Sequence, residues 1–184
     1  MAFDAFLIFS GGPTQITGET QDSVFGPKGA FEISEFSFGA ETTINITSAT
    51  MGAGAGKATF KEFTVKKQTD TASPALLQCL GTGDHYKKVQ LFIRKSGGAQ
   101  GKSGKAYLVF AFGLVAVKSI EWSGSTGDDV PTESVIFEFG ELVVGYYKQL
   151  TSGALGKLTP GSWSKLANST KTNLVSNPDD VSSP

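Results

Sequence analysis

The chain has 184 residues, the length of about one domain. Its 16 lysine and arginine residues nearly balance its 17 aspartate and glutamate residues, so it lacks the basic excess of a nucleic-acid-binding domain. Because the chain has one cysteine and one histidine, an internal disulfide, a cysteine-rich zinc site and a multi-histidine metal site are excluded. The chain also contains no run of about 18 apolar residues, the length that would predict a membrane span.

Glycine and phenylalanine are abundant and indicate the fold class. The chain holds 23 glycines and 14 phenylalanines; aromatic residues favour strands, and glycine favours turns. The first residues, MAFDAF, lack the basic region that opens a secretory signal peptide. We therefore expect a mainly β protein that is made in the cytoplasm, does not insert into membranes and uses no cofactor or metal.

The first two predicted strands cover residues 2–9 and 30–40. SGGP at 10–13 ends the first, and the turn signal Gly26-Pro27 precedes the second. Within residues 30–40 the apolar residues change from odd to even positions. Side chains alternate faces along a strand, so this change predicts a β-bulge near Ser34-Glu35.

Beyond the predicted bulge, the second strand has one apolar and one polar face. Phe36 and Phe38 share the apolar face, and Glu35 and Ser37 share the polar one. A strand that is apolar on one side and hydrated on the other is typical of a barrel wall.

Residues 43–56 follow and show no periodic apolar pattern. They end in MGAGAG and are too many for a tight hairpin turn. Long ordered loops are often functional, so we expect a role for this one.

One segment, residues 73–80, predicts a helix. Ser73 can cap its start, Pro74 suits the first helical position and Gly81 suits the stop. Leucines at 76, 77 and 80 form a one-sided apolar stripe of about two turns. A helix this short must pack on a sheet to be stable.

The remaining predicted strands cover residues 57–67, 86–95, 106–122 and 133–150. The last two are long, and Gly113 and Gly140 are the expected points at which they bend or break. Residues 96–105 predict a flexible loop. Together the segments predict a small β-barrel with one short helix.

The composition changes at residue 151. Residues 151–184 are rich in serine, threonine, asparagine, glycine and proline, and Trp163 is their only aromatic residue. We therefore predict a domain at 1–150 and a mostly flexible tail at 151–184, with Trp163 as a docking point.

Motifs for catalysis or nucleotide binding are weak. The glycine-rich segments before Lys57 and Lys102 both fail the phosphate-loop pattern, because the required first glycine is missing from each. Asp84-His85 lacks a nucleophile on a defined turn, so a surface or interface histidine is the favoured interpretation. Cys79 lies between apolar residues and predicts a buried, inert thiol.

An ordered series of segments resembles the Hcp family, the tube protein of bacterial type VI secretion systems. The segments are Gly18-Glu19, Phe36-Ser37-Phe38-Gly39, residues 54–63, the Ser-Pro helix at 73–80, Gly83 with His85-Tyr86 and residues 93–98, and residues 132–147. No single motif is diagnostic, but the resemblance covers roughly residues 2–150 in one consistent order.

The resemblance implies a two-sheet β-barrel flanked by one helix and carrying an extended loop, a fold related to phage tail-tube proteins. It implies homohexameric rings that stack into a hollow tube, which a contractile sheath fires with a spike at its tip. The implied partners are further copies of the chain, sheath and spike proteins, and small effectors held in the ring lumen. The implied location is the bacterial cytoplasm, followed by export through the system to the extracellular space or a target cell.

The resemblance also suggests site residues. Glu35 and Ser37 are candidates for lining the lumen and contacting cargo. The extended loop at 43–56 corresponds to the family's contact with neighbouring subunits or the next ring. Its candidate residues are Thr43, Ile44, Asn45, Ile46, Met51, Gly52, Gly54 and Gly56. No catalytic residue is expected.

Two other functions remain open from the sequence. The first is a monomeric or dimeric adaptor on the same fold that recruits a partner through residues 151–184. The second is a secreted toxin enzyme, for which the chain offers only His85 and scattered carboxylates.

Overall fold

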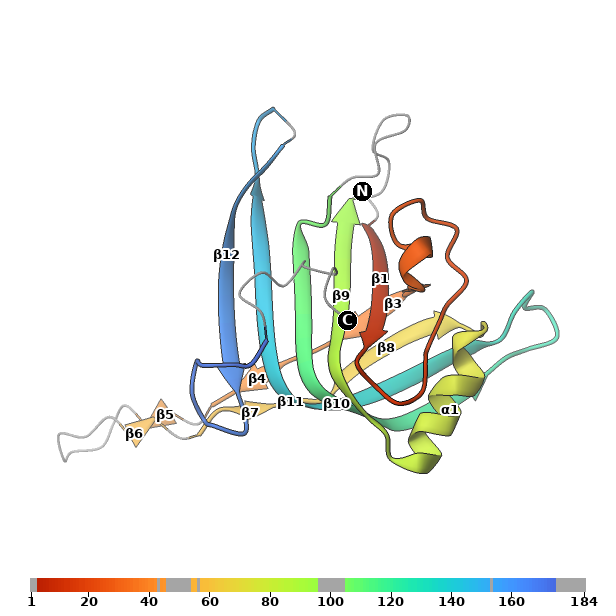
Figure 1. The fold of residues 1–184 in the computed structure, drawn as a ribbon, viewed down its shortest axis with the longest axis horizontal. Helices are drawn as coiled ribbons and strands as arrows, with labels where there is room; N and C mark the ends of the chain where they lie inside the picture. Colours follow the sequence, from red (N-terminus) through yellow and green to blue (C-terminus); the bar gives the residue numbers. More distant parts are fainter. Residues whose placement is uncertain are drawn as a thin grey trace.

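The computed structural model describes residues 3–42, 44–45, 54–55, 57–95, 105–152 and 154–174. It is mainly β, with one α-helix in the described part, and confirms the predicted fold class (Figure 1). The elements are β1 Phe3–Ser10, η1 Gly26–Lys28, β2 Phe31–Glu32, β3 Glu35–Ser37, β4 Ala40–Glu41, β5 Ile44–Asn45, β6 Gly54–Ala55, β7 Thr59–Phe60, β8 Phe63–Gln68, α1 Ala72–Thr82, β9 His85–Lys95, β10 Leu108–Ser123, β11 Thr132–Gln149 and β12 Leu155–Ser164.

Eight strands form one curled antiparallel sheet. The order is β2-β1-β9-β10-β11-β8-β3, with β12 added on β11. β11 pairs with β10 over most of its length, with β8 along its first part and with β12 along its last part. β11 therefore connects the part of the sheet that contains β8 with the part that contains β12.

The segment from β2 to β3 connects the two ends of this sheet. The Ile33 N–H donates to the Ala5 carbonyl of β1 (2.9 Å), and the Ser34 N–H donates to the Lys66 carbonyl of β8 (2.8 Å). Phe31 is buried before this point, and Phe36 packs on the core after it. The change of apolar face is confirmed, but the predicted β-bulge near Ser34-Glu35 is not its cause. The chain instead changes partner strand between residues 33 and 34.

β10 and β11 bend together along one line across the sheet. On β10 the core side chains are Phe112 and then Val115, three positions apart instead of two. Leu114 lies between them with φ 51°, a left-handed conformation that is unusual for leucine. Gly140 lies beside it on β11, where an added Cβ would come within 3.3 Å of the Leu114 Cβ. The bends therefore lie where Gly113 and Gly140 predict them, and they divide the sheet into the two layers of Figure 1.

Aromatic rings fill the space between the layers. Phe63 and Phe112 have ring centroids 4.5 Å apart, and both are buried. A second cluster covers the other face of β1 and β9, where Phe6 stacks on Phe25 at 4.4 Å beside Phe92. The central strands are thus buried on both faces, which explains why residues 5–9 are continuously apolar.

The helix is confirmed, but its ends differ from the prediction. α1 begins at Ala72, and Thr71, at the N-cap, makes no side-chain capping bond. Asp70 supplies the cap instead, because its Oδ1 accepts the Ala72 N–H at 2.9 Å, while Ser73 Oγ accepts the Asp70 N–H at 3.0 Å. The helix continues past Gly81 and ends at Gly83, whose φ of 69° suits glycine. No helix in the described ranges is long and apolar enough to cross a membrane.

The prediction of a flexible tail from residue 151 is wrong for most of its described part. Leu155–Ser164 form β12, which pairs with β11 from Glu141 to Gln149. Glu141 is buried, and its carboxylate accepts the Asn173 backbone N–H at 2.9 Å and the Asn173 side-chain amide at 3.0 Å. Trp163 lies in β12 and packs near Phe60, with ring centroids 6.4 Å apart. Residues 175–184 lie outside the described part.

Candidate functional site

The outward side chains of β3, β8, β11 and the second half of β10 form a mainly hydrophilic surface, the polar face, in which Ile136 is an apolar residue between Thr64 and Ser119. Cross-strand pairing fixes its rows, because Glu35 lies opposite Lys66 and Ser37 opposite Thr64. The row of Lys66 continues to Ser134 on β11 and Glu121 on β10. On the opposite side of the same strands, Phe63, Val65, Val135 and Phe137 are buried. These strands are therefore two-faced, as the sequence predicts for residues 35–38.

The charges of the polar face occur mainly as opposite pairs. Lys66 Nζ lies 2.8 Å from Glu35 Oε2, and both side chains are largely exposed. Lys118 forms an ion pair with Glu62. The hydrogen bond and charge of Glu62 raise the pKa of Lys118, and Glu138 adds to this effect. Glu138 itself forms an ion pair with Lys165. The face thus offers hydroxyl groups and balanced charge.

The candidate loop residues are only partly within the described ranges. The backbones of Ile44–Asn45 and Gly54–Ala55 pair as the two-stranded β5–β6 ladder, so the loop returns on itself. The predicted candidates Thr43, Ile46, Met51, Gly52 and Gly56 lie outside the described residues.

A buried ionic cluster lies beneath the start of α1. Lys67 Nζ contacts Glu133 Oε1 and Asp70 Oδ1, each at 2.7 Å, and Ser73 Oγ at 3.2 Å. The cluster joins β8, β11 and α1. This cluster was not predicted from the sequence, although strand alternation indicates it: because Phe63 and Val65 face inward, Lys67 must also face inward.

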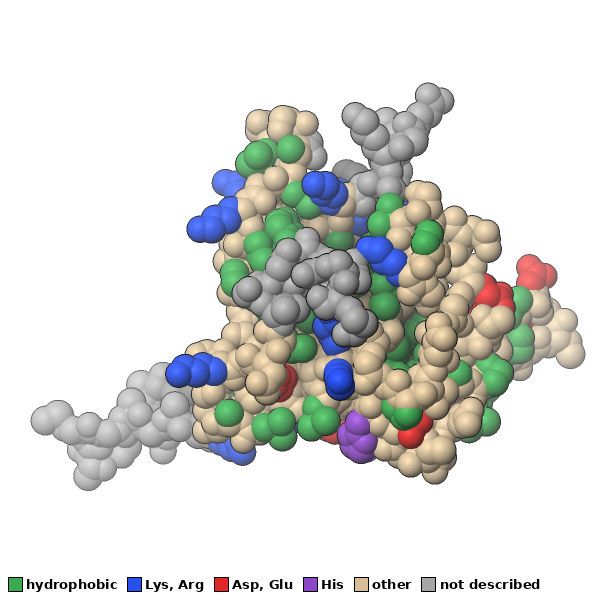
Figure 2. All heavy atoms as spheres, viewed as in Figure 1, with side chains coloured by type: hydrophobic (Ala, Val, Ile, Leu, Met, Phe, Trp, Pro, Cys, Tyr) green, Lys and Arg blue, Asp and Glu red, His purple; other side chains and the backbone are tan. Residues whose placement is uncertain are grey.

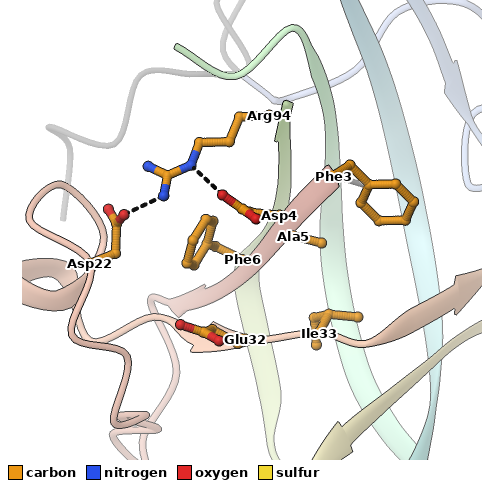
Figure 3. A pocket seen from close by; sticks show the side chains of 8 residues that line it. All are labelled: Phe3, Asp4, Ala5, Phe6, Asp22, Glu32, Ile33 and Arg94. Carbon is orange, nitrogen blue, oxygen red and sulfur yellow. Dashed lines mark hydrogen bonds and ion pairs between the residues drawn. The ribbon is translucent and has the colours of Figure 1, made fainter. Parts of the chain in front are cut away.

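A second ionic group, formed by Arg94, Asp4 and Asp22, holds the N-terminal segment against β9 (Figure 3). Arg94 Nε donates to Asp4 Oδ2 at 3.1 Å, and its Nη2 pairs with Asp22. The guanidinium also lies over the ring of Phe6, 4.8 Å from the centroid. These residues line a small cavity of ≈280 Å³ that also contacts Glu32.

In this ionic group, burial and hydrogen bonding have opposite effects on the pKa values of Asp22 and Arg94. Burial would raise the pKa of Asp22, but the hydrogen bonds from Arg94 and from the backbone N–H groups of Val24 and Phe25 outweigh it, and the pKa is lowered. Burial would lower the pKa of Arg94, yet the bonds to Asp22 and Asp4 raise it. The hydrogen bonds therefore favour the charged forms of Asp22 and Arg94, and the ion pair suits a structural clamp.

The residues considered as catalytic candidates, His85 with Asp84 and Cys79, are far less organised than these ionic groups. His85 is exposed, and the neighbouring Asp84 accepts the hydroxyl of Thr14 at 2.9 Å. Cys79 is buried, as predicted, 2.8 Å from the Tyr86 hydroxyl. Burial and the contact with Cys79 raise the pKa of Tyr86 far above its ordinary value. Within the described ranges, no group of three or more histidine, cysteine, aspartate or glutamate side chains could hold a metal ion.

Comparisons with known proteins agree with this architecture. Residues 6–146 match the family model described as type VI secretion system effector, Hcp. Protein Hcp1 of Pseudomonas aeruginosa is 33% identical over 98 residues, which cover 53% of this chain and 59%, less than two thirds, of that relative.

Solved structures match a larger share of the chain. The chain resembles a type six secretion system protein at a TM-score of 0.81 and 30% identity, covering 92% of this chain and 100% of the other. Hcp1 from Salmonella typhimurium shares the fold at a TM-score of 0.69 and 24% identity, with coverage of 91% and 98%. The family match and the shared fold show that the chain belongs to the Hcp family of type VI secretion system proteins.

Proposed function

We propose that this protein is a subunit of the type VI secretion inner tube. It assembles into hexameric rings that stack into a tube, carries small effectors in the lumen and contacts the sheath and spike proteins of the machine. It leaves the bacterial cytoplasm through that machine and works as a structural and carrier protein without catalysing a reaction.

The polar face is the observation that carries this proposal. Four adjacent strands bury one face and present serine, threonine and paired charges on the other. A surface of this kind suits the wall of a water-filled channel, because it stays hydrated without a strong field of one sign. In the ring, the polar faces of neighbouring copies then form one lumen wall.

Glu35 and Ser37 take different parts on that wall. Ser37 is exposed and offers a hydroxyl that can donate to or accept from a cargo protein. Glu35 is engaged with Lys66 across the strand pair, so its charge is balanced locally. The returning β5–β6 ladder supports a role for residues 43–56 in reaching a neighbouring subunit or ring.

Native mass spectrometry at low micromolar concentration, with negative-stain images of the same sample, tests the proposal. We expect one species of six subunits and ring-shaped particles. A stable monomer that persists at higher concentration would overturn the tube function and favour an adaptor.

A further inference from the structure

The charges of the C-terminal half are segregated along the chain. Residues 119–147 contain six acidic residues and no lysine or arginine, and residues 148–178 contain four lysines and no acidic residue. The acidic residues are Glu121, Asp128, Asp129, Glu133, Glu138 and Glu141, and the lysines are Lys148, Lys157, Lys165 and Lys171.

Two hairpins from these segments lie at opposite ends of β11. The β10–β11 hairpin, residues 124–131, precedes β11, and the β11–β12 hairpin, residues 150–154, follows its 18 residues. Figure 2 shows acidic side chains at the β10–β11 end, on the right, and lysine or arginine side chains on the upper left, over β11 and β12. Asp128 and Asp129 thus lie in the hairpin at one end of β11, and Lys148 and Lys157 lie beside the hairpin at its other end.

A groove lies at the acidic end. It has a volume of ≈560 Å³, within the roughly 300–1,000 Å³ of ligand-binding clefts. The N-terminal segment, the β2–β3 connection, the turn before α1 and the β10–β11 hairpin surround it. Its carboxylates are Glu19, Glu32 and Asp70, and no lysine or arginine is among the described residues that line it.

Two further features favour a cationic partner there. Lys67 pairs with both Asp70 and Glu133, so the cluster has two carboxylates for one ammonium group, a formal net charge of one negative unit. The buried Oγ1 atom of Thr69, which lines the groove, has no hydrogen-bond partner in the described part. An unsatisfied polar atom strengthens the attraction for a polar partner at the groove.

We propose that the β11–β12 hairpin of one copy contacts the acidic groove of the next copy in the assembly. This inference rests on the proposed function, because it names the contact between subunits. Lys148 and Lys157 are exposed and supply the cations. Leu150, 46% exposed at the hairpin, meets Val130, 37% exposed at the groove rim.

The contact joins two different surfaces of the same chain. After one such heterologous contact, the pair still has one free groove and one free hairpin, so the contact repeats until a ring closes or a filament grows. Because it depends on exposed charges, it weakens as ionic strength rises.

Charge reversal tests the proposal in the full chain. We expect K148E/K157E, or D129K/V130K, to raise the concentration for half-assembly at least tenfold, and a mixture of the two variants to assemble with each other. The control K28E/K87E changes net charge as much as K148E/K157E at exposed sites elsewhere and should assemble like the unmodified protein. Unchanged assembly of both reversal variants would overturn the proposed contact while leaving the tube function intact. An unmodified protein that never assembles would overturn both.

Cysteine cross-linking gives a second readout, since Cys79 is buried. A V130C protein mixed with an L150C protein should form a disulfide-linked heterodimer under mild oxidation, and neither protein alone should do so. If no cross-link forms within an assembled sample, the groove does not receive the hairpin.

Discussion

Lys67 and Glu133 form an ion pair of 2.7 Å inside the barrel, with both side chains inaccessible to solvent. Removing one partner leaves the other charge buried and uncompensated. We expect Lys67→Met to lower the free energy of unfolding by about 3–5 kcal/mol. Urea denaturation followed by circular dichroism measures this loss.

The adjacent lysine provides a matched control. Lys66 points to the opposite, exposed side and pairs with Glu35. Lys66→Met should change the unfolding free energy by less than about 1 kcal/mol, because exposed pairs contribute little. Equal losses for the two variants would contradict the assignment of Lys67 to the interior.

The clamp between Asp22 and Arg94 should make stability depend on pH in the acidic range. The pKa of Asp22 is below its ordinary value of 3.8, so its stabilising contribution is complete above that value and is lost as the pH falls through the lowered pKa. Asp22→Asn removes this contribution at neutral pH. The stability difference between the variant and the unmodified protein should therefore shrink below about pH 4. A difference that stays constant from pH 7 to pH 3 would show that Asp22 is not held in its charged form.

Two glycines at the end of α1 should respond to alanine in opposite directions. Gly81 lies within the helix with open space around its Cα, and Gly83 has φ 69° at the C-cap. Gly81→Ala should stabilise by about 0.5–1 kcal/mol through helix propensity. Gly83→Ala should destabilise by about 1 kcal/mol, because the left-handed conformation strains an alanine. Thermal unfolding of both variants checks the pair, and a stabilising Gly83→Ala would place the helix end elsewhere.

Gly18 should tolerate no side chain. A Cβ at this position would lie 2.3 Å from the Phe31 Cβ and 2.6 Å from the Ala30 carbonyl oxygen. We expect Gly18→Ala to lower the melting temperature by several degrees, because the backbone must shift to relieve the contact. Gly127→Ala, at a site with nothing within 4 Å of the added atom, is the control. If Gly18→Ala had the same melting temperature as Gly127→Ala, the segments that contain Gly18 and Phe31 would separate easily.

Strand alternation made part of this structure predictable. The apolar residues around Ser34 changed phase, and the chain does change partner there, which places Glu35 and Ser37 on the polar face. Gly113 and Gly140 marked the common bend of β10 and β11 because glycine permits the close approach of Leu114.

Other features depend on contacts between distant segments. β12 was missed because it is an edge strand whose exposed residues include Pro160, which lacks the N–H that a central strand requires. The start of the helix was misplaced because Asp70, which pairs with Lys67 in the buried cluster with Glu133, supplies the cap that Ser73 was expected to provide. Ser73 instead contacts the buried Lys67.

The position of Ser37 in the assembled particle tests the central claim most directly. A Ser37→Cys variant can carry a maleimide-linked gold cluster at that single position, because Cys79 is buried. Electron microscopy of labelled rings should show the added density around the central axis, inside the ring wall. Density on the outer rim of the ring would contradict a lumen lined by the polar face.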